Sequence, residues 1–95
     1  MIKVSALVLS TVLFSGLTQA CTKPTAPALP DAATAVTAQM VKAKHAVNAY
    51  MTAAEAYLEC ASSTIDHNRT VKSMKKVGEG FNEAVRSYKD RMSNA

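Results

Sequence analysis

Two segments of this 95-residue chain carry the same heptad spacing of mostly apolar residues, and this repeat limits the possible folds more than any other feature. In the first segment the positions alternate by four and three residues: Val36, Met40, Ala43, Val47, Tyr50, Ala54, Tyr57 and Ala61. The second segment repeats the rhythm at His67, Val71, Met74, Gly78, Phe81, Val85, Tyr88 and Met92. Such spacing places one stripe along each of two helices.

Folding the chain back on itself at Thr64 brings the two stripes together, so that Tyr50 meets Gly78. Large side chains then mostly oppose small or medium ones, as a packed interface requires. We therefore predict an all-α fold, an antiparallel and coiled-coil-like two-helix hairpin. We place the hairpin at residues 37–92, its turn near residues 62–66 and a short tail at residues 93–95. Ser63, with Asp66 three residues later, resembles a capping box for the second helix.

The segment before the hairpin, residues 21–36, should form an extended arm because three prolines interrupt it at Pro24, Pro27 and Pro30. Candidate N-caps for the first helix are Asp31, Thr34 and Thr37. At polyproline rise the arm is long enough to run back along the helix. We expect it to follow a strip of small residues at Ala46, Ala53 and Cys60, beside Val77 and Ala84 of the second helix.

The first 20 residues have the pattern of a secretory signal peptide. Lys3 gives a positive start, an apolar run extends to Phe14, and small residues at Thr18 and Ala20 suit cleavage before Cys21. We expect a periplasmic protein. A lipoprotein anchored through Cys21 is the alternative, although Gln19 makes the lipidation motif a poor one.

Cys21 and Cys60 are the two cysteines of the chain. An even number of cysteines in a small exported domain indicates a disulfide, and joining these two would close a loop of about 40 residues. The alternatives are a lipidated Cys21 beside a free Cys60, or an intermolecular bridge.

Several short motifs resemble those of an uncharacterised family of short exported proteins of Gram-negative bacteria. They are Lys23-Pro24, Leu29-Pro30-Asp31, AEAYLEC at residues 54–60, His67-Asn68 and FNEAVRSYK at residues 81–89. The resemblance implies a helical hairpin and an exported location, and it transfers no activity, ligand or site residue.

We expect neither enzymatic activity nor a cofactor. The chain has no recognisable nucleophile motif or phosphate-binding loop, and its paired carboxylates occupy solvent faces of helices. His45 and His67 lack a partner at metal-ligand spacing, so we expect no metal site.

Two surfaces remain as candidates for interaction. Met51 and Leu58 lie outside the predicted interface between the two helices. They suggest contact with a second copy or with an unknown envelope protein. The second helix carries most of the positive charge, with the basic residues Arg69, Lys72, Lys75 and Lys76 close together. These residues suit an anionic membrane surface or lipopolysaccharide. We do not expect nucleic acid as a partner of an exported protein. The favoured hypothesis is a structural or protein-interaction module, and the envelope-surface binder is the alternative.

Overall fold

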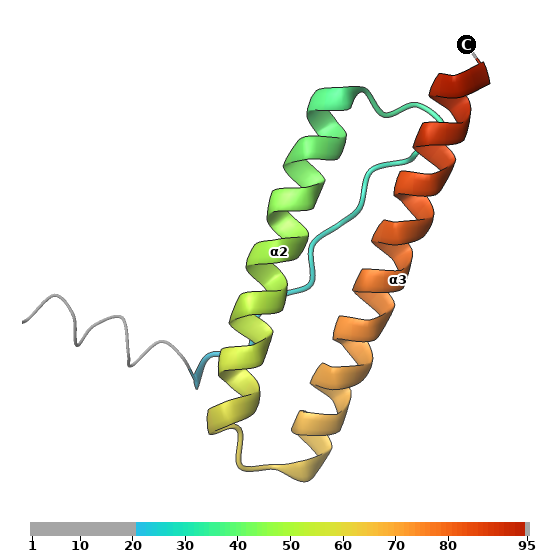
Figure 1. Cartoon of the computed structure of the whole chain (residues 1–95). Helices are drawn as coiled ribbons and strands as arrows, with labels where there is room; N and C mark the ends of the chain where they lie inside the picture. The colour runs from blue at the N-terminus through green and yellow to red at the C-terminus, as the bar shows by residue number, and fades with distance from the viewer. Residues whose placement is uncertain (1–20, 95) are drawn as a thin grey trace, which may run out of the picture.

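The computed structural model describes residues 21–94, which form an all-α hairpin (Figure 1). Helix α2 spans Thr37–Cys60 and helix α3 spans Thr64–Asn94. The predicted signal peptide, residues 1–20, lies outside the described residues. Within residues 21–94, neither helix combines the length and apolar character that crossing a membrane requires.

Helix α2 begins at Thr37, the predicted start of the hairpin, but none of the three predicted residues caps it. The N-cap residue is Val36, and the Gln39 side chain reaches back to accept a hydrogen bond from its backbone N–H at 2.9 Å. Asp31 instead stabilises a turn within the arm, where its carboxylate accepts the Ala33 N–H at 2.9 Å. Valine has no side-chain oxygen that could cap the helix. The Gln39 side chain nevertheless bonds the backbone N–H of Val36, which is half of a capping box, and this bond holds the start of the helix.

The connection between the helices is short, at residues 61–63. Ser63 starts α3 as predicted, because its hydroxyl accepts a hydrogen bond from the Asp66 N–H at 3.3 Å. The helix continues to Asn94, so the predicted tail at residues 93–95 begins too early. Ser93 belongs to the last turn, where its hydroxyl donates to the Lys89 carbonyl at 2.9 Å.

The arm is part of the packed structure. It crosses behind α2 near the end of that helix and continues between the two helices toward the open end of the hairpin (Figure 1). Leu29 packs against the core formed by Val47, Tyr50, Ala54 and Val77. The hydrophobic core therefore draws on three segments of the chain.

The buried stripe of α2 agrees with the heptad prediction except at its two ends. Its buried residues are Met40, Ala43, Val47, Tyr50, Ala54 and Tyr57. At the ends, Val36 is 58% exposed and Ala61 is half-buried.

The prediction for α3 is correct only in part, because the helix is rotated. Met74 and Phe81 pack against the core as predicted, but the most deeply buried residues are different ones. Thr70 and Val77 are the buried residues of α3, whereas the predicted interface residues Val71 and Met92 are 46% and 45% exposed and His67 is also exposed. The cause is the arm. Because α3 packs against the arm as well as against α2, its buried face turns toward both neighbours.

This rotation also changes the predicted side-chain pairs. Gly78 does not lie against Tyr50; a β-carbon at Gly78 would instead lie 3.5 Å from the Cε of Met51. The Tyr50 hydroxyl is hydrogen-bonded to the Ser73 hydroxyl, at 2.6 Å. Ser73 is absent from the predicted interface positions, since a serine carries no hydrophobic signal.

Candidate functional site

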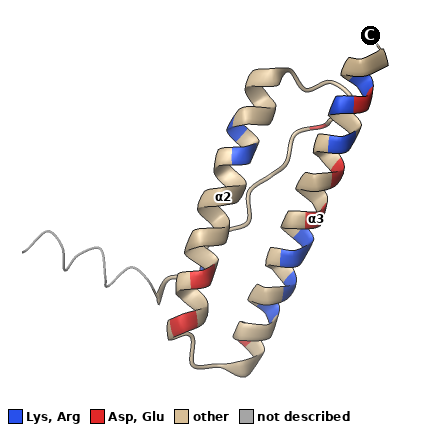
Figure 2. Ribbon diagram, viewed as in Figure 1, with Lys and Arg blue, Asp and Glu red and all other residues tan. Residues whose placement is uncertain are grey.

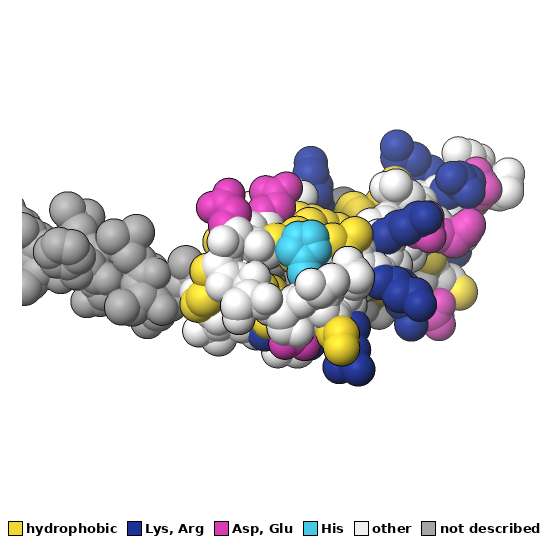
Figure 3. Space-filling view, turned by 90° about the horizontal axis from the view of Figure 1, so that it is seen from below, with side chains coloured by type: hydrophobic (Ala, Val, Ile, Leu, Met, Phe, Trp, Pro, Cys, Tyr) yellow, Lys and Arg dark blue, Asp and Glu magenta, His cyan; other side chains and the backbone are white. Residues whose placement is uncertain are grey.

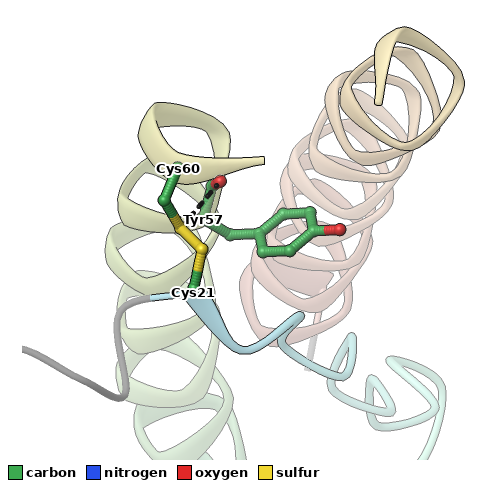
Figure 4. The surroundings of a disulfide bond; sticks show 3 residues. All are labelled: Cys21, Tyr57 and Cys60. Atoms are coloured by element: carbon green, nitrogen blue, oxygen red, sulfur yellow. Dashed lines mark hydrogen bonds between the residues drawn. A yellow bond between two sulfur atoms is a disulfide. The ribbon is translucent and has the colours of Figure 1, made fainter. Parts of the chain in front are cut away.

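A disulfide joins the beginning of the arm to the end of α2, as predicted from the cysteine count. The Cα atoms of Cys21 and Cys60 are 5.5 Å apart. Figure 4 shows the bridge at the last turn of α2, with the ring of Tyr57 pointing away from it toward α3. The Cys60 sulfur also lies 3.5 Å from the Tyr57 carbonyl oxygen. The bridge therefore fixes the arm next to the turn of the hairpin.

The other end of the arm is held by Arg91 of α3. Its Nε donates to the Ala32 carbonyl at 3.1 Å, and its terminal nitrogen donates to the Ala35 carbonyl. The guanidinium carbon lies 5.4 Å from the centre of the Tyr88 ring, within the range of a cation–π contact. With the disulfide at one end and Arg91 at the other, the arm is tied along one side of the hairpin.

Two different sides of α2 line two depressions: one is next to the arm, and the other is an apolar groove between the two helices. Lys42 and Ala46 line a shallow depression together with Leu29 of the arm. Val41 and Lys44 line a groove between α2 and α3. Because an α-helix turns about 100° per residue, Ala46 and Lys44 point in directions about 160° apart. The groove is therefore on the side that the arm leaves uncovered.

The uncovered side carries apolar residues from both helices, which we call the open face. Its members are Val41, Met51 and Leu58 on α2, and Val71, Met74, Phe81, Val85, Tyr88 and Met92 on α3. All of them are at least partly accessible, and Val41 is 49% exposed. A helix pair that is covered on both sides would not expose large apolar residues in this way. The open face is thus the natural candidate for a binding surface.

The groove at the open end of this face has a volume of about 410 Å³. Its apolar lining comes from Met40, Val41, Phe81, Val85 and Tyr88, and the lysines at its edges are Lys44 and Lys89. A hydrogen bond between the Thr37 and Tyr88 hydroxyls links the two helices at this end. The groove offers an apolar floor with positive charge at its rim.

Met51 and Leu58, the predicted contact residues, are both half-buried. Met51 packs against the core residues and over Gly78, so part of its side chain serves the hairpin itself. Their role in an interaction stays a prediction. Sequence reasoning missed the exposed α3 residues of the open face, Val71 and Met92, because the heptad pattern assigns them to the interface with α2. Met74 and Phe81, which border the open face, also pack against the core as that pattern predicts.

The structure brings together three of the four predicted basic residues. Arg69, Lys72 and Lys76 line a shallow depression of about 340 Å³ with Ser73, and Lys75 is not part of it. We call these three residues the basic face. Seen from the turn of the hairpin, apolar side chains lie between acidic side chains on the α2 side and a mixture of basic and acidic side chains on the α3 side (Figure 3).

Within residues 21–94, no three His, Cys, Asp or Glu side chains come close enough to hold a metal ion. His45 and His67 are both exposed. The carboxylates of Glu79 and Glu83 border an outer depression with Asn82 and Arg86, and Glu83 forms an exposed ion pair with Arg86 at 3.4 Å.

Comparisons of the chain with protein-family models, with curated proteins and with solved structures give no match. The resemblance to a family of exported bacterial proteins therefore stays a prediction from the sequence motifs.

Proposed function

We propose that this protein is a non-enzymatic periplasmic interaction module that binds a protein partner through its open face. One observation carries the proposal. The arm is tied to a single side of the hairpin by the Cys21–Cys60 disulfide and by Arg91, and the opposite side keeps large apolar residues accessible. Two helices and one arm make a thin core, and a partner on the open face would bury the remaining apolar surface.

The disulfide supports the exported location, because such bonds persist in oxidising compartments and are rare in the cytosol. It also favours a protein free of lipid over a lipoprotein, since a Cys21 sulfur bonded to Cys60 is not available for a lipid thioether. Both points agree with the signal-peptide pattern of the first 20 residues.

Site-specific photocrosslinking in cells tests the open face directly. A photoreactive amino acid at Val71 should give a discrete adduct, because this residue is exposed on the open face. The matched control is Glu83, which is exposed on the outer side of the same helix. Adducts at Val71 and none at Glu83 would support the proposal. Equal adducts at both positions, or none at Val71, would overturn it.

A second candidate function, binding to an anionic membrane surface, is favoured by the basic face. Three cationic side chains converge there on one depression, and their attraction to anionic lipid would fall as salt screens it. The test is sedimentation with vesicles that contain phosphatidylglycerol. Lys72→Glu with Lys76→Glu should abolish binding, whereas Lys42→Glu with Lys89→Glu, the same charge change elsewhere, should reduce it less. Absence of binding at low salt would end this candidate.

A further inference from the structure

We propose that the partner on the open face is a second copy of this chain, docked so that the two α2 helices run antiparallel. The inference rests on the proposed function and names its partner. It is carried by the distribution of charge along α2, which is shown in Figure 2.

The charges of α2 are separated along the helix. Lys42 and Lys44 lie in its first half, toward the open end of the hairpin, and Glu55 and Glu59 lie in its last turns (Figure 2). A helix of this kind is complementary to an antiparallel copy of itself, because each basic end then meets an acidic end. A parallel copy would bring like charges together.

Three of these four charges, Lys44, Glu55 and Glu59, border the open face, whereas Lys42 lines the depression beside the arm. At about 100° per residue, Lys44, Met51, Glu55 and Leu58 lie within about 60° of one another around α2. The midpoint between Lys44 and the two glutamates falls close to Met51. A two-fold axis through this point would place Met51 at the centre of the contact, with Lys44 of each copy beside the glutamates of the other.

None of these charges forms an ion pair within residues 21–94. The ion pair among the described residues is Arg86–Glu83, on the outer side of α3. Lys44 and Glu55 are 11 positions apart on one helix, or about 16 Å along its axis, so they cannot meet within one chain. A second copy provides both partners at once.

The rival face-to-face arrangement, with the two hairpin turns at the same end, is disfavoured by charge. It would stack α2 on α3 of the other copy and bring Lys44 near Lys89, because both border the groove at the open end. Like charges that face each other at a contact are unfavourable. The antiparallel arrangement avoids this clash.

The test is sedimentation velocity of the disulfide-bonded protein from residue 21 onward, over a wide concentration range. The wild type should form a dimer. Lys44→Glu should raise the dimer dissociation constant by about tenfold or more, since two symmetric sets of contacts become repulsive. Lys42→Glu, the same charge change on the arm side, should leave the constant almost unchanged.

A charge exchange identifies the arrangement. Lys44→Glu alone and Glu55→Lys with Glu59→Lys alone should each dimerise poorly, but an equimolar mixture should form a heterodimer in which every contact is again attractive. A monomeric wild type at high concentration would overturn the inference. So would a dimer that Lys44→Glu and Lys42→Glu weaken equally, or a mixture that does not associate.

The photocrosslinking experiment separates this inference from the proposed function. An adduct at Val71 with twice the mass of the chain supports a second copy. An adduct of another mass, with a monomeric purified protein, overturns the second copy and leaves the open face as a binding surface. No adduct at Val71 together with a monomer overturns both.

Discussion

Leu29 of the arm fills the space beside Gly80 of α3: a β-carbon at position 80 would lie only 3.1 Å from the Leu29 Cδ1 atom. The absence of a side chain at position 80 is what lets the arm approach α3 so closely. This contact, together with the disulfide and Arg91, decides which side of the hairpin is covered and which is left open.

The two helical glycines should respond differently to alanine. Gly78→Ala should raise the free energy of unfolding by up to about 1 kcal/mol, because the new methyl group would make an ordinary contact with Met51 at 3.5 Å. Gly80→Ala should gain less stability, since the Leu29 side chain must shift to make room for the new methyl group. Urea unfolding at low protein concentration measures both. An equal gain at the two sites would contradict the close packing of the arm.

A larger residue at position 80 should displace the arm. Gly80→Leu should lower the free energy of unfolding by about 2 kcal/mol, a typical result of overpacking. Gly78→Leu is the control, because the end of the flexible Met51 side chain can move aside there. Equal losses of stability in the two variants would mean that the packing of Leu29 does not require the space beside Gly80.

Removal of the disulfide should weaken the whole fold. Replacing Cys21 and Cys60 together by serine should cost about 4 kcal/mol on the chain-entropy estimate for a loop of this length. Circular dichroism during urea unfolding gives the value, and the wild type treated with reductant is the control. A loss below about 1 kcal/mol would show that the disulfide adds little to the Leu29 and Arg91 contacts that also hold the arm.

Arg91→Ala should free the arm near the start of α2. The variant loses two hydrogen bonds from a charged donor to partly buried carbonyl groups, so we expect a loss of about 2 kcal/mol. The free energy of unfolding of Arg91→Lys should lie between those of the wild type and Arg91→Ala, because an ammonium keeps the charge but lacks the planar fork of donors.

The matched control is Arg86→Ala, whose exposed ion pair with Glu83 should be worth less than about 0.5 kcal/mol. Hydrogen exchange of the Thr34 and Ala35 amides, both bonded to the Asp31 carbonyl, should accelerate in the Arg91 variant alone. Unchanged exchange would contradict the anchoring role of Arg91.

Thr70→Val should stabilise the protein. Thr70 is 3% exposed and its hydroxyl has no hydrogen-bond partner among the described residues. Exchange for an apolar group of the same shape removes the cost of burying that hydroxyl, a gain of up to about 1 kcal/mol. Thr52→Val, at an exposed position of α2, should change little. A destabilised Thr70 variant would show that the hydroxyl has a bonding role.

The sequence predicts the hairpin and the α2 half of the interface because the buried residues of α2, from Met40 to Tyr57, keep the heptad spacing without interruption. It did not predict the rotation of α3, where Val71 and Val77 are both apolar and periodicity alone cannot choose between them. That choice depends on a non-local contact between Leu29 and Gly80, which leaves no periodic signal in either segment.

The sequence predicts the basic residues of the candidate site but not the exposed apolar residues of α3. The spacing of Arg69, Lys72 and Lys76 is enough to place them on one side of a helix, and they line one depression in the fold. The heptad spacing of Val71 and Met92 predicts that they are buried, since an apolar residue at that spacing gives no sign of whether its partner belongs to the same chain. The arm is what leaves them exposed.

The most direct test of the open face is a dilution series followed by ¹H–¹⁵N NMR on the disulfide-bonded protein. We predict concentration-dependent shifts at Val41, Leu58, Val71 and Met92, with constant shifts in the arm at residues 24–35. Shifts confined to the arm, or spectra that do not change with concentration, would contradict self-association through the open face.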